Sequence, residues 1–209
     1  MDLSLYLVTD RDLSLGRTNE EVVRRALSAG VTTVQYRDKN APARPMVSEG
    51  LVLAAMCREA GVTFIVNDRL DVALICGADG VHLGQDDLGA SDARRMAGPD
   101  FIIGVSVTTP EEARTARDEG ADYLAANGVF PTATKTDLGS PLGLEGVAAL
   151  AGSTGLPMVA IGGIDASNAG AVVRAGAKGV AVVSFIVSHD DIEGRCAALL
   201  ESMRSGRSS

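Results

Sequence analysis

The sequence is poor in the residues that usually carry nucleophilic, disulfide and metal chemistry. Its 209 residues include three cysteines and two histidines. The spacing of Cys57, Cys76 and Cys196 matches neither a disulfide framework nor a metal-binding motif, which favours a reducing compartment. His82 lies within an apolar run and His189 in a late polar segment, and neither forms an evident pair with a nucleophile. The sequence therefore does not indicate covalent catalysis.

Excess basic charge and long hydrophobic runs are also missing. Lys and Arg together number 19 against 27 Asp and Glu, giving a net charge of −8 and a sequence pI of about 4.8. This balance argues against a nucleic-acid-binding surface, although a local field can still attract small anions. The longest apolar run, 179–187, is interrupted by Ser184 and is too short to span a bilayer. We expect a soluble, cytoplasmic protein without a basic leader and without nucleic-acid or membrane partners.

Short apolar segments rich in β-branched residues recur along the whole chain. They read as continuous apolar runs, which is typical of parallel strands buried on both faces. The eight expected strands are 3–9, 32–36, 63–67, 80–83, 101–106, 123–127, 158–162 and 179–184. Helical patterns lie between them, for example at 18–29, 45–60, 110–119 and 168–175.

A glycine follows five of the helical segments, just before the next strand. Such a glycine supplies the left-handed residue that ends a helix. The positions are Gly30, Gly61, Gly77, Gly120 and Gly176. This serial arrangement predicts a single (β/α)8 TIM barrel over 1–209, with 204–209 as a disordered tail. The alternative is an open doubly wound sheet, but 9–18 lacks the glycine fingerprint of dinucleotide-binding sheets.

Carboxylates follow the third and fourth expected strands. Asn67 and Asp68 end one strand, and Asp86 and Asp87 come shortly after the next. In a barrel these positions meet at one face, where like charges repel unless a cation lies between them. Mg²⁺ is suited to such a site because it binds one or two carboxylates and leaves room for substrate phosphates. The alternative is that the aspartates only cap the following helices.

Two further strand ends predict anion-binding sites. After the second strand, alternation places Gln35, Arg37 and Lys39 on one side, where the two cations form an anion site or, alternatively, a solvated charged loop. After the seventh and eighth strands come Gly162-Gly163 and Ser184, where barrels often bind phosphate. The paired glycines alone are equally compatible with a tight turn.

The connection 127–143 is long for a barrel and is interpreted as a binding loop, the alternative being an ordinary polar surface loop. We interpret His82 as a hydrogen-bonded residue of the barrel interior or of its active face. Together these features predict an enzyme that handles one metal-bound diphosphate substrate and one phosphorylated co-substrate.

Several of these segments, in this order and over nearly the whole chain, resemble the thiamine-phosphate synthase family. The resemblance implies a transferase of thiamine biosynthesis that joins hydroxymethylpyrimidine diphosphate to a thiazole phosphate carboxylate. Diphosphate and CO₂ leave, and thiamine phosphate forms by a dissociative, Mg²⁺-assisted route. The segments are Tyr6-Leu7-Val8-Thr9-Asp10, Val34-Gln35-Tyr36-Arg37-Asp38-Lys39, Asn67-Asp68, Gly80-Val81-His82-Leu83-Gly84-Gln85-Asp86-Asp87, Gly104-Val105-Ser106, Phe130-Pro131-Thr132-Ala133-Thr134-Lys135 and Ile161-Gly162-Gly163-Ile164.

The resemblance also implies roles for individual residues. Asp68 and Asp87 would hold Mg²⁺. The pyrimidine diphosphate would contact Gln35, Arg37, Lys39, Asn67, Ser106 and Lys135. The thiazole phosphate would contact Thr132, Thr134, Gly163, Val183 and Ser184. The catalytic set would be Arg37, Lys39, Ser106 and Lys135.

One segment departs from the family pattern, since Asn127-Gly128-Val129 stands where the family commonly has Gly-Pro. Two other functions stay open at this point, a thiazole tautomerase-like relative and a non-catalytic binder of thiamine phosphates. The sequence also leaves open whether the chain forms a homo-oligomer.

Overall fold

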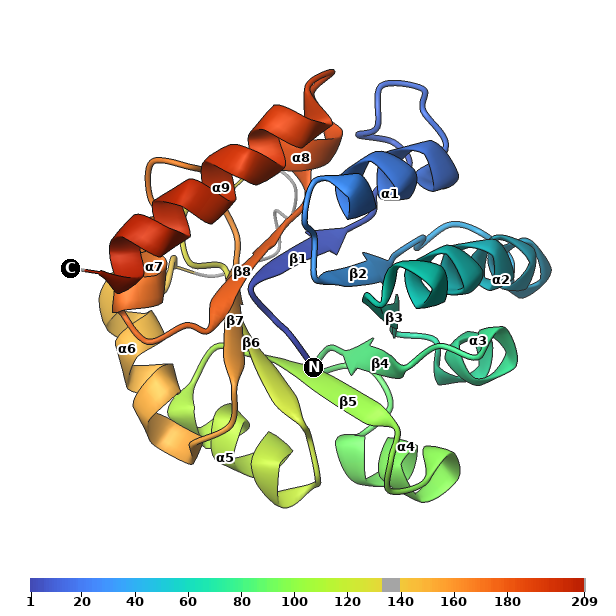
Figure 1. Ribbon diagram of the computed structural model, residues 1–209. Coiled ribbons are helices and arrows are strands. Elements are labelled where there is room, and N and C mark those ends of the chain that lie inside the picture. Colours follow the sequence, from blue (N-terminus) through green and yellow to red (C-terminus); the bar gives the residue numbers. More distant parts are fainter. Residues whose placement is uncertain (133–139, 209) are drawn as a thin grey trace.

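Eight parallel strands close into a barrel in the computed structural model, which describes residues 1–132 and 140–208 (Figure 1). Neighbours in sequence pair in order, and β1 pairs with β8, with Leu5 opposite Val180. The predicted (β/α)8 barrel is therefore confirmed. The strands are β1 (Leu5–Val8), β2 (Thr33–Tyr36), β3 (Thr63–Asn67), β4 (Gly80–Leu83), β5 (Ile102–Val107), β6 (Tyr123–Asn127), β7 (Met158–Ile161) and β8 (Gly179–Val182).

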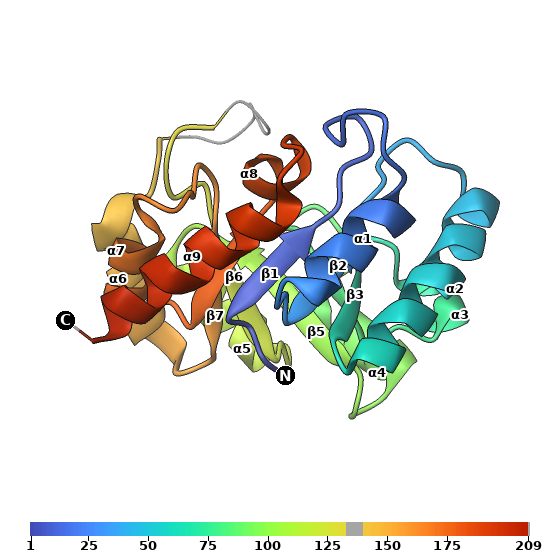
Figure 2. The same cartoon turned by 45° about the horizontal axis from the view of Figure 1, so that its top comes forward.

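Helices cover the outside of the barrel (Figure 2). The described helices are α1 (Asn19–Ser28), α2 (Ala43–Ala60), α3 (Leu70–Cys76), α4 (Ala90–Ala97), α5 (Pro110–Asp118), α6 (Gly143–Thr154), α7 (Ala169–Arg174), α8 (Ser184–Val187) and α9 (Ile192–Arg207). All five glycines expected to end helices have a positive φ, between 63° at Gly77 and 112° at Gly176. Among the described residues, no helix is both long and apolar enough to cross a membrane.

The strands bury both of their faces, as their continuous apolar sequences indicate. Along β1, Leu5 and Leu7 belong to the large core between the barrel and the helices. Tyr6 and Val8 face the other way, into a smaller core inside the barrel that also contains Tyr123. The period of two along each strand therefore decides which side chains reach the barrel interior.

The expected disorder at the end of the chain is wrong for the residues that the structure describes there. Helix α9 runs to Arg207, whose guanidinium donates to the carbonyl of Lys178 at 2.7 Å. Gly206 is buried, and a Cβ on it would lie 2.4 Å from the carbonyl oxygen of Gly170 in α7. The small residues that suggested a frayed tail instead let α9 approach α7 closely, and Ser209 lies outside the described residues.

This close approach predicts a specific sensitivity of stability. In Gly170→Ala the new Cβ would lie 2.7 Å from the carbonyl oxygen of Ser202 and 3.5 Å from the Cα of Gly206. We expect overpacking to lower the free energy of unfolding by about 1–3 kcal/mol, which corresponds to a fall in Tm of roughly 2–12 °C. The matched control is Gly152→Ala in α6, where a Cβ meets nothing within 4 Å. Calorimetry showing equal Tm values for the two variants would contradict close packing of α7 on α9.

Candidate active site at the carboxyl ends of the strands

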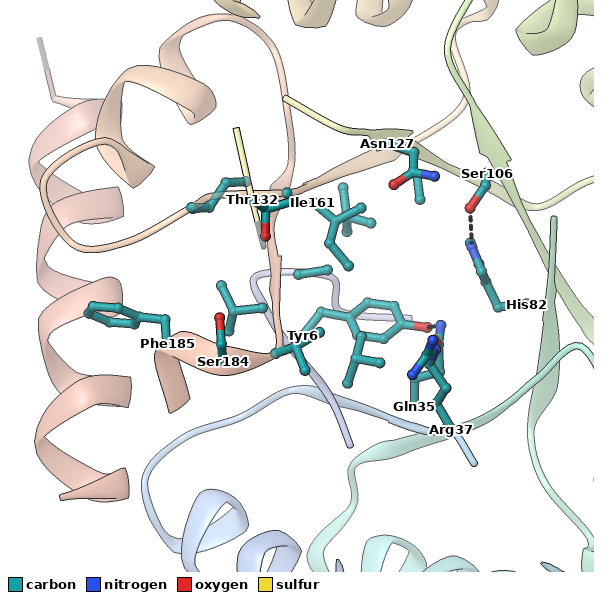
Figure 3. Close-up of a pocket in the computed structure, with 18 of the residues that line it drawn as sticks. Tyr6, Gln35, Arg37, His82, Ser106, Asn127, Thr132, Ile161, Ser184 and Phe185 are labelled. Atoms are coloured by element: carbon teal, nitrogen blue, oxygen red, sulfur yellow. Dashed lines mark hydrogen bonds between the residues drawn. The ribbon is translucent and has the colours of Figure 1, made fainter. Parts of the chain in front are cut away.

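A pocket with an empty volume of about 950 Å³ opens at the carboxyl ends of the strands (Figure 3). Residues from strand ends around the barrel contribute to its wall, as expected for the functional face of this fold. They include Tyr6, Gln35, Arg37, Asn67, His82, Ser106, Asn127, Thr132, Gly163, Val183 and Ser184.

Strand β2 and the residues after it supply the basic side of the site. Gln35 and Arg37 face the pocket, while the intervening Tyr36 points outward and donates to Glu49 of α2 at 2.7 Å. Arg37 is oriented by Asp10, which accepts from its Nη1 at 3.1 Å. Lys39 does not reach the pocket wall, and lines an adjoining hollow together with Arg37 and Asp10. The predicted cationic side is thus present. Arg37 lines both the pocket and the adjoining hollow, whereas Lys39 lines only the hollow.

Asp68 and Asp87 form the predicted pair of carboxylates beside this basic side. Burial and the neighbouring Asp87 carboxyl raise the pKa of Asp68 to about 6, whereas Lys39 and Arg37 act in the opposite direction. Asp68 has a left-handed backbone, with φ 61°, a conformation that is unfavourable for a residue other than glycine. Its N–H donates to the carbonyl of His82 at 2.8 Å, which ties the end of β3 to β4.

Neither Asp68 nor Asp86, the aspartates considered as helix caps, caps a helix. The capping residues are Arg69 for α3 and Gly89 for α4, so the alternative considered from the sequence is wrong. Asp87 instead accepts from the N–H of Gly84 at 2.7 Å, a bond that holds its carboxylate within the turn after β4. The pair is therefore positioned by its loops and is available to a ligand.

This pair fits a magnesium ion that shares its ligands with a phosphate. Mg²⁺ typically takes one or two carboxylates and completes its octahedral shell with water and substrate phosphates. Within the described ranges, no group of three or more His, Cys, Asp or Glu side chains could hold a metal, so a closed all-protein site is not formed there. Asp68 and Asp87 could therefore hold Mg²⁺ as part of a shell completed by water or by a ligand, next to the positive charges of Arg37 and Lys39.

The opposite side of the pocket is built for close approach to the backbone. Gly162 and Gly163 have φ values of 111° and 62°, and a Cβ on Gly163 would lie 2.6 Å from the carbonyl oxygen of Pro131. Gly162 and Gly163 therefore do form a tight turn. The backbone N–H of Phe130 also donates to the carbonyl of Gly162 at 3.0 Å. Among the described residues, the N–H groups of Gly163 and Ile164 have no acceptor, which leaves two donors for an anion.

Ser184 and Thr132 lie on the same side of the pocket (Figure 3), and Val183 also lines it. We expected Ser184 at the end of the eighth strand, but β8 ends at Val182 and Ser184 begins the short helix α8. A short helix after the last strand is a frequent part of phosphate sites in this fold.

Beneath the pocket, His82 is hydrogen-bonded at both ring nitrogens, which confirms its interpretation as an interior polar residue. Nδ1 lies 2.9 Å from the hydroxyl of Tyr123 and Nε2 lies 2.9 Å from Oγ of Ser106. The Tyr123 hydroxyl continues to that of Tyr6 at 2.8 Å, which in turn accepts from Nε2 of Gln35 at 2.8 Å. The sequence reading missed the two tyrosines. Alternation along the first and sixth strands, applied to the barrel interior, would have found them.

The structure thus brings most of the predicted site residues together around one pocket, and their roles stay predictions. Thr134 and Lys135 lie outside the described residues. Asn127, the departure from the family pattern, ends β6 and lines the pocket near Ser106 (Figure 3). Its amide adds a polar group at this part of the wall.

The closed barrel and the polar pocket at its carboxyl end are the architecture of a barrel enzyme. The sequence matches the family model of thiamine monophosphate synthase over residues 5–186. The thiamine-phosphate synthase of Moorella thermoacetica is 46% identical over 97% of this chain and 97% of its own, and that of Haloarcula marismortui is 48% identical over 99% and 100%. The solved thiamine phosphate pyrophosphorylase of Pyrococcus furiosus superposes with a TM-score of 0.90 at 41% identity, covering 98% and 97%. The chain belongs to the thiamine monophosphate synthase family.

The raised pKa of Asp68 predicts how metal binding depends on pH. Because this pKa is about 6 in the folded protein, above its ordinary value of 3.8, Asp68 takes up a proton as the pH falls through about 6. Mg²⁺ must then displace that proton, so its apparent affinity should fall by up to about tenfold per pH unit below 6. Calorimetric titration of the ligand-free protein with Mg²⁺ between pH 5 and pH 8 measures this.

The matched variant for this titration is Asp68→Asn, which keeps the shape of the side chain and removes its titration. Binding of Mg²⁺ to this variant should be weaker at every pH and should vary less between pH 5 and pH 7. If the affinity of the wild-type protein for Mg²⁺ were constant over this range, Asp68 would not be a ligand of the metal.

Proposed function

We propose that the protein joins 4-amino-2-methyl-5-hydroxymethylpyrimidine diphosphate to a thiazole phosphate carboxylate, with Mg²⁺, to give thiamine phosphate. Membership of the family makes it a transferase of the thiamine-phosphate synthase type, acting in thiamine biosynthesis on small phosphorylated substrates. One observation carries the assignment of substrates to places: the pocket has a basic side, beside which Asp68 and Asp87 lie together, and, opposite it, a glycine-rich side where two N–H groups have no acceptor among the described residues.

The diphosphate belongs on the basic side in this proposal. Arg37 offers a planar pair of donors to its oxygens, and Lys39 offers a compact charge in the adjoining hollow. Asp68 and Asp87 hold the metal, and Asn67, at the end of β3, reaches the same part of the pocket. Mg²⁺ bound there supplies positive charge to the diphosphate as it leaves. Lys135 is a further proposed contact from the segment outside the described residues.

The proposed reaction needs charge stabilisation and alignment more than a nucleophile of the protein. The bond between the pyrimidine methylene carbon and the diphosphate oxygen breaks, and its electron pair leaves with the diphosphate. The nitrogen of the thiazole then donates its lone pair to the resulting carbocation and forms the new C–N bond. Loss of CO₂ returns an electron pair to the thiazole ring, and uptake of one proton from solvent completes thiamine phosphate. Fixed positive groups that face the leaving oxygen are the largest contribution a protein makes to such a step, and Arg37 is held in place by Asp10.

The second substrate is placed by its phosphate on the opposite side. The N–H groups of Gly163 and Ile164, the hydroxyl of Thr132 and the start of α8 at Ser184 surround that position. With both phosphates anchored at the ends of one pocket, the reacting nitrogen and carbon are held near each other, which lowers the entropic part of the barrier. A cytoplasmic location and a homo-oligomeric state remain predictions.

Replacing either carboxylate tests the proposed function. Asp68→Ala and Asp87→Ala should each lower kcat by about 10²-fold or more, by analogy with the loss of one transition-state contact. Thermal stability should change little, because the loss of like-charge repulsion within the pair offsets the loss of the bond from the Gly84 N–H to Asp87. The measurement is the rate of thiamine phosphate formation with both substrates and Mg²⁺, and Asp92→Ala, on the exposed face of α4, is the matched control.

Three outcomes of this assay are distinct. Wild-type turnover in either variant would remove that residue from the metal site. Wild-type protein that aromatises the thiazole carboxylate but forms no thiamine phosphate would be a tautomerase-like relative. Wild-type protein that binds thiamine phosphate but converts neither substrate would be a non-catalytic binder.

Gly163→Ala tests the phosphate position. The new Cβ would lie 2.6 Å from the Pro131 carbonyl oxygen, on a backbone with φ 62°. The backbone should shift away from the phosphate, so KM for the thiazole phosphate should rise by about tenfold or more, given a strain of order 1–3 kcal/mol. KM for the pyrimidine diphosphate should stay within about twofold, since its anchors lie opposite.

Gly143→Ala is the matched control for this change, because Gly143 also has φ 62° but a Cβ there meets nothing within 4 Å. It carries the same backbone strain without the collision. A crystal grown with thiamine phosphate decides the matter directly. A phosphate found beside Arg37 and Lys39 would overturn the assignment of the two sides.

A further inference from the structure

A continuous chain of hydrogen bonds crosses the interior of the barrel and ends in the pocket on both sides. Its members, in order, are Gln35 of β2, Tyr6 of β1, Tyr123 of β6, His82 of β4 and Ser106 of β5. The four successive distances are 2.8, 2.8, 2.9 and 2.9 Å. Gln35 and Ser106 line the pocket, and Tyr123 does not. Two substrate-facing groups are therefore connected through a residue that is away from the substrate.

The order of donors along this chain follows from counting protons. Each phenol has one hydrogen to donate. The Tyr6 hydroxyl accepts from the amide of Gln35, and at 1% exposure it has almost no access to water, so its hydrogen goes to Tyr123. Tyr123, which is fully buried, then donates to Nδ1 of His82. Burial raises the pKa of both tyrosines well above the ordinary value, so both phenols keep their hydrogens.

The far end of the chain is fixed by the same count. A neutral imidazole that accepts at Nδ1 carries its hydrogen on Nε2. His82 Nε2 therefore donates to Oγ of Ser106. With that lone pair occupied, the hydroxyl hydrogen of Ser106 is directed to an acceptor in the pocket. At the other end, the amide nitrogen of Gln35 is committed to Tyr6, which leaves its carbonyl oxygen as an acceptor.

The barrel is shaped to hold the tyrosine at the centre of this chain. A Cβ on Gly104 of β5 would lie 2.0 Å from Cζ of Tyr123 and 2.4 Å from its hydroxyl oxygen. Glycine at this position leaves the space that the ring occupies. The ring centroid of Tyr123 lies 6.1 Å from that of Tyr6 and 5.5 Å from that of His82, so packing also restrains the three rings.

We propose that Tyr123 is a positioning residue that, through the tautomer of His82, makes Ser106 a hydrogen-bond donor to the substrate while Gln35 acts as an acceptor. The ligand that fits is a heteroaromatic ring with an acceptor nitrogen and an exocyclic amine. This inference rests on the proposed function, in which an aminopyrimidine occupies this part of the pocket. A ring that carries an N–H donor in place of the acceptor nitrogen would set its hydrogen against the hydroxyl hydrogen of Ser106, so it should bind more weakly.

The first test is a double-mutant cycle. Tyr123→Phe removes one hydroxyl and keeps the ring, and it should lower kcat/KM for the pyrimidine diphosphate by about tenfold, the effect of one buried hydrogen bond. KM for the thiazole phosphate should stay unchanged. In a Ser106→Ala background the same change should cost less than about twofold, because its target is already absent. Equal losses in the two backgrounds would overturn the proposal, since the effect would then not pass through Ser106.

Tyr36→Phe is the matched control. It removes a buried hydroxyl of β2 whose bond points outward to Glu49, so it reports the general effect of losing a phenol bond on stability. Its kcat/KM should stay within about twofold of the wild type. A tenfold loss in this variant would attribute the Tyr123→Phe effect to destabilisation.

The second test needs no substrate and so fails independently of the proposed function. Nitrogen NMR of histidine-labelled protein shows two imidazoles, because the chain has two histidines, and His189→Gln assigns them. The resonances of His82 should be those of the Nε2–H tautomer in the wild type. In Tyr123→Phe the population should shift toward Nδ1–H. An Nδ1–H tautomer in the wild type would reverse every bond in the chain and overturn the proposal.

Discussion

Closure of eight parallel strands into one barrel is the constraint on which the other features depend. Closure brings eight strand ends around a single opening, and the period of two along each strand sends alternate residues inward. Gln35 and Arg37 thereby face the pocket while Tyr36, between them, holds α2 on the outside. Tyr6 and Tyr123, which are far apart in sequence, meet in the barrel interior below the same pocket. If the register of a strand shifted by one residue, its pocket-facing side chains would face the helices and its outward side chains would face the pocket.

Charge is distributed along this pocket in a way that suits two anions rather than one. On one side, Asp68 and Asp87 repel each other in the absence of a cation, and Arg37 and Lys39 partly offset that repulsion. On the other side, uncharged N–H groups and hydroxyls are the donors in the described part of the chain. The net charge of −8 does not predict the charge on either side of the pocket, because the local potential depends on the groups within a few ångströms.

The barrel, its strands and most of its pocket residues could be predicted because they follow from local rules. Continuous apolar runs identified all the strands, and glycines with positive φ ended the helices where expected. Three features depended on tertiary contacts instead. The tail became helical because Gly206 packs on Gly170, Ser184 began a helix rather than ending a strand, and the interior chain of Tyr6, Tyr123 and His82 joins residues up to 117 positions apart. A sequence pattern places such residues on a face but does not show which of them meet.

The backbone of Asp68 has a consequence for how the protein would respond to its ligands. This residue combines a left-handed conformation with a carboxyl that is driven toward its protonated form. Both are local departures from the lowest free energy of the ligand-free chain, and they persist because the surrounding barrel is stable enough to maintain them. A cation and a diphosphate bound here, as we propose, would neutralise the repulsion without changing the fold. The metal site would then be a strained part of the free enzyme, and saturation with ligand would raise the melting temperature of the whole domain through mass action.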